Sequence, residues 1–159
     1  ESLKTIVLKI VKDGLENVKL EDAKIIVSGG RGIQNEHGVK LLNELATVIG
    51  GVVSGSRGAV EKDLIDHNRQ VGQTGKTVSP KLYFAVGISG AIQHTVGLQG
   101  SETIIAINTD PECPMMKIAT YSIVGDALTI LPKLIKVFKE SLSELKNLNS
   151  NMKGGVNVE

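Results

Sequence analysis

The apolar residues of this chain fall into short continuous runs that are separated by glycine-rich stretches. Such runs occupy residues 23–27, 52–53, 82–86, 103–107 and 121–124, and most are rich in Val and Ile. Short apolar runs bounded by turn residues are typical of strands buried on both faces of a parallel sheet. The pattern therefore predicts a series of buried parallel strands.

Apolar residues recur at helical spacing between several of these runs. Helices are predicted for residues 36–49, 59–65 and 127–148, with a further short helix ending near Gly97. Strand and helix thus alternate along the chain. This alternation predicts a single α/β domain with a Rossmann-like parallel sheet and helices on both faces.

Three segments fall outside this alternation. Residues 3–11 carry several β-branched side chains and predict an edge strand. Residues 66–80 show no periodicity and predict a long loop, a feature that is usually functional in a compact domain. The polar, glycine-containing residues from 149 onward predict a disordered tail.

Composition narrows the class of protein. The chain has 159 residues, 41% hydrophobic, with a mean hydropathy of +0.07 and a net charge of +1, which suits one soluble domain. With so little net charge, 3% aromatic residues and no Trp, nucleic acid is a poor candidate partner. No apolar run is long enough to span a membrane. A single cysteine, Cys113, excludes an internal disulfide and favours the cytoplasm, or the mitochondrial matrix, as compartment.

Two similar glycine-rich motifs follow neighbouring predicted strands. They are SGGRG at residues 28–32 and SGSR at residues 54–57, and each brings an arginine to the carboxyl end of a strand. Ligands of open parallel sheets bind outside the carboxyl ends of the strands. The two motifs therefore predict a paired anion site, although each alone could be an ordinary turn with a surface arginine.

Other motifs in the same half of the chain are incomplete. The GxxxxGK[ST] pattern of a P-loop needs glycine where this chain has Gln70, and Ser89 stands at the second glycine of a dinucleotide fingerprint. His94 follows closely and could be a packed structural histidine or a ligand-facing one. No HExxH, CxxC or EF-hand pattern predicts a metal, and Cys113 is interpreted as structural.

Taken together, the motifs resemble one known family. The stretches VSGGRG (27–32), SGSRGAV (54–60), QVGQTGKTVSPKLYFAVGISGAIQH (70–94) and AINTDPECP (106–114), with Gly125-Asp126, are similar to the C-terminal FAD-binding domain of electron transfer flavoprotein alpha subunits. The resemblance implies FAD as cofactor and an electron carrier rather than an enzyme. It also implies a heterodimer with the electron transfer flavoprotein beta subunit, and flavin dehydrogenases such as acyl-CoA dehydrogenases as electron partners.

The resemblance also assigns roles to residues. The flavin or a phosphate would be contacted by Arg31, Ser56 and Arg57. The flavin would be lined by Val71, Gly72, Gln73 and Thr74, with Thr74 near N5. The pyrophosphate and ribityl region would be contacted by Ser89, Gly90, Ala91, Ile92, Gln93 and His94, with His94 at the pyrimidine edge, and the adenosine half would be held by Asn108 and Asp126.

The domain organisation implied by the resemblance has three parts. Residues 1–20 would be a linker or the remnant strand of an absent N-terminal domain, residues 21–148 the FAD-binding domain, and residues 149–159 a tail. Gly58, Glu61 and Lys62 stand where more apolar residues are expected. Two alternatives remain open: a nicotinamide-dependent oxidoreductase or deacylase domain, and a structural domain that binds AMP or CoA.

Overall fold

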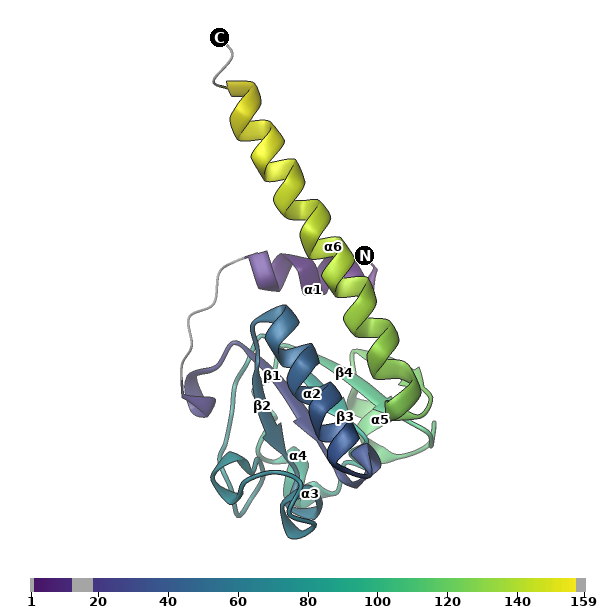
Figure 1. Cartoon of the computed structure of the whole chain (residues 1–159). Coiled ribbons are helices and arrows are strands. Elements are labelled where there is room, and N and C mark those ends of the chain that lie inside the picture. The colour runs from purple at the N-terminus through teal and green to yellow at the C-terminus, as the bar shows by residue number, and fades with distance from the viewer. Residues whose placement is uncertain (1, 13–18, 157–159) are drawn as a thin grey trace.

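The computed structural model describes residues 2–12 and 19–156, and within them a five-stranded sheet forms the centre of the fold. The strands are β1 (Ile25–Gly29), β2 (Val52–Gly55), β3 (Leu82–Val86), β4 (Thr103–Asn108) and β5 (Tyr121–Val124). All neighbouring pairs are parallel, in the order β2-β1-β3-β4-β5 (Figure 1). The predicted α/β class with a Rossmann-like parallel sheet is confirmed.

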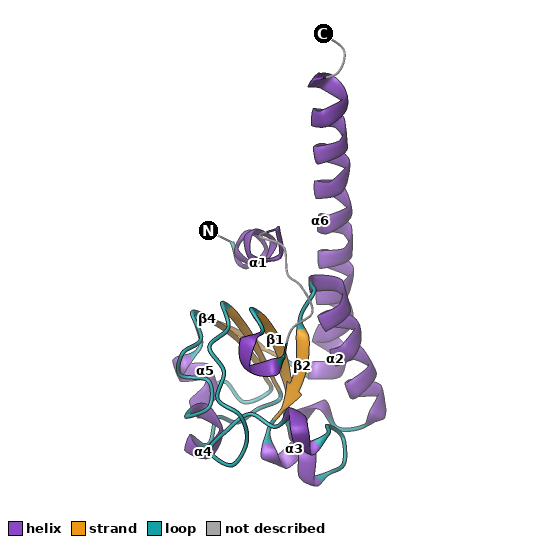
Figure 2. Ribbon diagram, turned by 90° about the vertical axis from the view of Figure 1, so that its left-hand side faces the viewer, coloured by secondary structure: helices purple, strands orange, loops and turns teal. Residues whose placement is uncertain are grey.

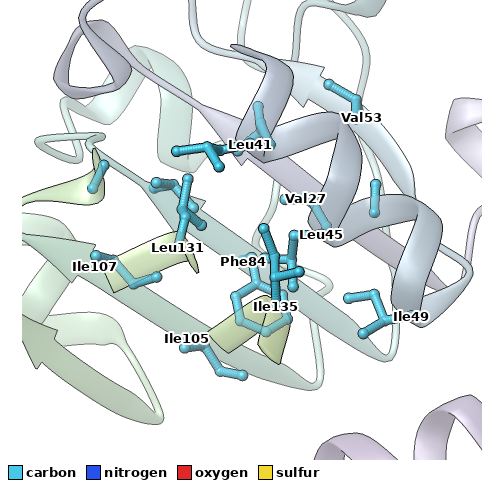
Figure 3. Close-up of a cluster of buried hydrophobic side chains, with 14 of the residues drawn as sticks. Val27, Leu41, Leu45, Ile49, Val53, Phe84, Ile105, Ile107, Leu131 and Ile135 are labelled. Atoms are coloured by element: carbon cyan, nitrogen blue, oxygen red, sulfur yellow. The ribbon is translucent and has the colours of Figure 1, made fainter. Parts of the chain in front are cut away.

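One face of the sheet is covered by long helices. Figure 2 shows α2 (Glu36–Ile49) and α6 (Ala127–Val156) lying side by side against it. Asn35 caps the start of α2 by accepting a hydrogen bond from the Gly38 amide, and Gly50 ends this helix in the left-handed conformation. Alternate strand residues such as Val27, Phe84 and Ile105 pack against both helices (Figure 3).

The opposite face is covered by shorter elements. These are the 3₁₀ turn η1 (Leu20–Asp22), residues 71–78, α4 (Ile92–Thr95) and α5 (Pro114–Ile118). The strand residues between those of the first face, among them Ile26, Tyr83 and Ala106, are buried under this layer. Both faces of the sheet are therefore buried, as the continuous apolar runs predict.

The prediction of a strand at residues 3–11 is wrong, because these residues lie in helix α1 (Leu3–Lys12). Leu3, Val7 and Ile10 share one side of that helix, and Val7 is fully buried in the same cluster as α2 and α6. Packing of this apolar stripe outweighs the preference of β-branched residues for strands. Of the rest of the predicted segment 1–20, residues 1 and 13–18 lie outside the described residues, and Leu20 begins η1.

The prediction of disorder from residue 149 is also wrong as far as Val156, because α6 continues to that residue. Figures 1 and 2 both show the end of α6 extending beyond the sheet. Leu142, Leu145, Leu148 and Met152 recur every three or four residues there, a spacing that continues the helical pattern. Residues 157–159 lie outside the described residues.

Three smaller differences concern connecting segments. The helix predicted at residues 59–65 is shifted toward the N-terminus and is shorter, since α3 runs over Arg57–Glu61. Residues 66–80 form a loop as predicted, with one 3₁₀ turn, η3, at His67–Arg69. The short α5 was not predicted, and the turn placed at Cys113 is the N-cap of that helix. Among the described helices, none is long and apolar enough to cross a membrane.

Candidate functional site

The order in which the chain adds strands reverses between β1 and β3. From β1 the chain passes outward to β2 on one side, and it then returns to add β3, β4 and β5 on the other side. The carboxyl ends of β1 and β3 meet there through three glycines. Gly87 has a φ of +65°, and a Cβ on Gly30 or Gly32 would lie 2.4 or 2.5 Å from Gly87 backbone atoms. Only glycine permits this backbone contact. Ligands of doubly wound sheets bind at such a reversal.

Two backbone amides of this turn are already bonded within the protein. Gly30 N–H donates to the Val86 carbonyl at 2.9 Å, and Gly32 N–H donates to the Gly87 carbonyl at 3.0 Å. These two amide groups therefore join β1 to β3 and are not available to an anion. The role of the two glycines is the close approach of β1 to β3, and the anion-binding capacity of the motif rests on the Arg31 side chain.

A cleft of about 640 Å³ opens beside this turn. A volume of this order is typical of sites for small molecules and cofactors. The cleft brings together most of the residues that the resemblance assigns to the cofactor. Those that line it are Arg31, Ser56, Arg57, Val71, Gln73, Thr74, Ser89, Ala91, Gln93 and His94.

Both arginines of the paired motifs lie in the lining of the cleft, about 70% exposed. Arg31 belongs to the 3₁₀ turn η2 (Arg31–Ile33), and Arg57 begins α3. Arg57 Nε donates to Glu61 Oε1 at 2.9 Å, while Arg31 Nη2 lies 3.7 Å from Glu61 Oε2. The predicted pairing of two guanidinium groups at one rim is therefore present, and a carboxylate joins them.

Two hydroxyl groups in the lining of the cleft have their oxygens engaged while a proton remains to donate. Ser56 Oγ accepts a hydrogen bond from the Ala59 amide at 3.3 Å and so caps α3. Thr74 Oγ1 accepts from the Gln70 side-chain amide at 2.8 Å. A hydroxyl that accepts one bond can still donate another. The cleft thus offers positioned donors for the acceptor atoms of an electron-rich ligand.

The loop that carries Thr74 is bonded to two neighbouring elements although it has little regular structure. Val71 N–H donates to the Gly55 carbonyl at the end of β2, and Gln73 N–H donates to the Gln93 carbonyl at 2.6 Å. Gly72 has a φ of +142°, and a Cβ there would lie 2.6 Å from the Gln93 oxygen. The loop is therefore fixed between β2 and α4, which positions its side chains for binding.

His94 is buried against the floor of the cleft and is engaged on both ring nitrogens. Nδ1 lies 3.0 Å from the Val71 carbonyl, and Nε2 lies 2.9 Å from the Tyr83 hydroxyl. Since a carbonyl only accepts, Nδ1 carries the proton, and Nε2 accepts from Tyr83. Burial lowers the pKa of His94 to about 4, against a smaller opposing effect of the Val71 hydrogen bond, so the ring is neutral at pH 7.

The Tyr83 hydroxyl extends this polar group into the sheet. Burial raises the pKa of Tyr83, while the nearby Ser28 and Ser54 hydroxyls oppose that shift. Ser28 and Ser54 are fully buried on β1 and β2, and within the described residues their side-chain oxygens have no hydrogen-bond partner of good geometry. Sequence reasoning placed His94 either in the core or on the ligand. In the structure His94 is buried and bonded within the protein, and it is also one of the residues that line the cleft.

Asn108 and Asp126 lie outside the lining of this cleft; Asn108 is the last residue of β4, and Asp126 follows β5. Asn108 Nδ2 donates to the Ile88 carbonyl at 3.2 Å, and Asp126 Oδ1 accepts from Gln34 Nε2 at 2.7 Å. Both lie at the carboxyl edge of the sheet that also borders the cleft. A ligand reaching them would have to extend along that edge from β3 to β5.

Gly72, Gly90 and Ile92 are also absent from the cleft lining. Gly90 has a φ of +92° and approaches the Met115 backbone closely, so it shapes the turn, whereas the Ile92 side chain is 69% exposed. Residues that line the cleft but were not predicted are Gly58, Glu61, Gln70, Gly87 and Ile88. The spacing of Glu61, four residues after Arg57, was the one sequence signal for its role.

A second hollow, of about 560 Å³, lies along the outer edge of β2 and η1. Three of its charged side chains have partners: Lys76 pairs with Glu21 at 3.1 Å, and Arg69 donates to the Val53 carbonyl at 3.0 Å. The Lys76 contact lowers the pKa of the Glu21 carboxyl. Within the described residues no group of His, Cys, Asp or Glu is arranged to hold a metal ion. The first cleft is therefore the stronger candidate site.

The fold and the cleft define a doubly wound domain with a candidate ligand site where the order of its strands reverses. Residues 19–99 match the family described as the electron transfer flavoprotein FAD-binding domain. The chain belongs to this family, and FAD is the family's cofactor.

Curated relatives agree with this assignment. Protein FixB of Clostridium saccharobutylicum is 55% identical over 141 residues, which cover 89% of this chain and 42% of that protein. The electron transfer flavoprotein subunit alpha of Bacillus subtilis (strain 168) is 50% identical over 138 residues, covering 87% of this chain and 42% of the relative. The chain thus spans about 42% of the length of these two relatives.

Solved structures show the same fold at much lower identity. A Sir2 homologue mutant in complex with ADP ribose has a TM-score of 0.54 and 13% identity, covering 85% of this chain and 97% of that one. Another structure, from work on the mechanism and regulation of Sir2 enzymes, has a TM-score of 0.52 and 13% identity, covering 87% of this chain and 99% of that one. These likenesses show the fold alone.

Proposed function

We propose that this chain holds one FAD in the described cleft and serves as the cofactor-binding domain of an electron transfer flavoprotein alpha subunit. When bound, FAD supplies the redox chemistry, because it accepts and releases electrons singly. The observation that carries the proposal is the convergence of Arg31, Arg57, Ser56 and Thr74 on one cleft at the strand-order reversal. Cations and hydroxyl donors fit the phosphates and ring acceptor atoms of such a cofactor.

The residues of this chain would bind the cofactor along the carboxyl edge of the sheet. Arg57, Thr74 and His94 would lie at the ring, and Ser89 and Gln93 beside the ribityl and phosphate groups. Asn108 and Asp126 would receive the adenosine half. The step from β3 to β5 crosses two strand spacings, roughly 10 Å in all, so an extended ligand is needed to join the two ends.

The partners of the whole carrier belong to the same proposal. The chain would work in a heterodimer with the electron transfer flavoprotein beta subunit, exchanging electrons with flavin dehydrogenases in the cytoplasm or the mitochondrial matrix. One relative from Dictyostelium discoideum is described as mitochondrial. With Tyr83 and Phe84 buried in β3, this chain has few rings to cover a flavin face. A second subunit would supply that cover.

An enzymatic role is supported less well than a carrier role. Both alternative activities, nicotinamide-dependent oxidation and deacylation, need an acid or base in the cleft, and His94 was the candidate for it. Its two ring nitrogens are bonded within the protein and its pKa is lowered to about 4. A carrier needs no such group, since its side chains only bind the cofactor and set its potential.

Titration with the two flavins tests the proposal. The 159-residue chain is expected to bind about one FAD, and FAD at least tenfold more tightly than FMN, because FMN leaves the adenosine contacts unused. Asp126→Asn should weaken FAD binding by about tenfold and leave FMN binding unchanged. Asp22→Asn, an exposed change on η1, is the matched control. Equal affinity for the two flavins, or an equal loss for both in the Asp126 variant, would refute the assignment.

A further inference from the structure

Glu61 contacts both arginines in the lining of the candidate cleft. It lies one helical turn after Arg57 on α3 and receives the Arg57 Nε–H on Oε1 at 2.9 Å. Its other oxygen, Oε2, faces Arg31 Nη2 at 3.7 Å. All three residues line the cleft, and each carboxylate oxygen faces a different guanidinium group. Glu61 therefore stands where an anionic ligand of the two arginines would compete.

The bridge to Arg31 depends on the absence of a side chain at position 58. A Cβ on Gly58 would lie 2.7 Å from Arg31 Nε and 2.9 Å from Arg31 Cγ. The Arg31 side chain thus lies directly over Gly58 on its way to Glu61. An alanine at this position would force the Arg31 side chain to move, while the Arg57 contact, which lies within α3, would remain.

These ion pairs are exposed enough to exchange. The three side chains are 51% to 70% exposed, and ion pairs of this kind contribute little to stability because water competes for both partners. The guanidinium groups can therefore leave Glu61 for a ligand at small cost. The carboxylate charge stays nearby, however, because α3 fixes its backbone. Two cations and one anion leave the cleft one positive charge rather than two.

We propose that Glu61 is a built-in counter-ion that limits how much of the positive charge of Arg31 and Arg57 reaches the bound cofactor. It would lower both the affinity of the cleft for FAD and the first reduction potential of the bound flavin. The inference rests on the proposed function, since it takes the electron-rich ligand to be FAD. It assigns to Glu61 a positioning and tuning role, with no chemical step of its own.

Glu61→Gln tests the charge while preserving the size of the side chain. We expect FAD to bind about three- to tenfold more tightly. Reduction of the flavin by one electron from dithionite, through mediator dyes, should become about fivefold more favourable. At 59 mV per tenfold change, this corresponds to a rise of about 40 mV in the first potential. Both effects should shrink as salt is raised, because counter-ions screen the carboxylate in the wild-type chain.

Two further variants separate the charge from its position and from net charge in general. Glu61→Asp keeps the carboxylate on α3, so its affinity and potential should stay close to the wild-type values. Glu44→Gln removes the same charge from another exposed ion pair, with Lys139 at 3.3 Å on the α2–α6 side, and should change neither quantity. Equal shifts in the Glu44 and Glu61 variants, or none in either, would overturn the inference.

The wild-type chain distinguishes this failure from failure of the proposed function. If it takes up no FAD in the same titration, the proposed function is wrong, and the role of Glu61 toward FAD falls with it. If it binds FAD but Glu61→Gln leaves affinity and potential unchanged, the function stands and the counter-ion role is wrong. A Glu61→Asp variant that behaves like Glu61→Gln would show that placement of the arginines, and not the charge, is what matters.

Discussion

The stability of this chain should fall as the pH is lowered from 7 to 5, and His94 should cause a large part of the loss. Burial lowers the pKa of this imidazole from 6.5 to about 4 in the folded chain. Between these values the unfolded chain binds a proton that the folded chain does not, so acid favours unfolding. One pKa unit corresponds to about 1.4 kcal/mol, and the shift gives about 2 kcal/mol of lost stability by pH 5.

Urea unfolding followed by far-ultraviolet circular dichroism at pH 7 and pH 5 measures this loss. The quantity compared is the change in the free energy of unfolding between the two pH values, measured for the wild type, for His94→Gln and for His37→Gln. His37 is exposed on α2, so its variant should lose as much stability as the wild type. The His94 variant should lose about 2 kcal/mol less than the wild type, whatever its stability at pH 7.

Nuclear magnetic resonance of the ring nitrogens provides a check that does not depend on a variant. The imidazole of His94 should carry its proton on Nδ1 at pH 7 and should stay neutral to about pH 5. Titration of His94 near pH 6.5, or an equal pH dependence of stability in all three proteins, would refute the reasoning. It would show that the Tyr83 and Val71 contacts do not bury the ring as described.

Two further outcomes follow from the site. Tyr83→Phe leaves His94 Nε2 buried without a donor and should lower the free energy of unfolding by about 1 to 3 kcal/mol. Tyr121→Phe, on the half-buried strand β5, is the control. An equal, small loss of stability in both variants would contradict the Tyr83–His94 hydrogen bond. Gly87→Ala should cost more than about 2 kcal/mol, because it combines a φ of +65° with a Cβ 2.5 Å from Gly32. Gly50→Ala has a φ of +74° but nothing within 4 Å, so denaturant unfolding should show a loss of about 1 kcal/mol.

The sheet could be predicted from the sequence because its signals are local. Each apolar run is bounded by glycine or polar turn residues. Because both faces of the sheet are buried, a strand is a continuous apolar run and can be recognised without an alternation of apolar and polar residues. The misassigned segment, residues 3–11, shows the limit of this argument. Its β-branched residues favour a strand, but Val7 becomes buried, and Leu3 and Ile10 partly buried, only in the cluster that α2 and α6 complete. Contacts so distant in sequence are invisible to local patterns.

The candidate site was predictable in part for the same reason. Arg31 and Arg57 were located by motifs that end strands, and parallel strands bring their carboxyl ends together. The Tyr83–His94 bond was not predicted, because a tyrosine inside an apolar run has the sequence pattern of an ordinary core residue. Glu61 was missed because an acid in a short helix is usually a solvated surface group. Its role depends on Arg31 crossing Gly58, a contact between segments far apart in the chain.

The site separates its groups into a neutral layer and a charged layer. At the buried side of the cleft, His94 is neutral because it is buried and bonded on both nitrogens, so a change from pH 8 to pH 6 puts almost no charge on it. In the lining, Arg31, Arg57 and Glu61 carry the charges and are exposed to water. A potential difference between variants of Glu61 should therefore be the same at pH 6 and pH 8. A difference that grew between these values would mean that His94 ionises when the cofactor is bound, and that the neutral layer is not neutral.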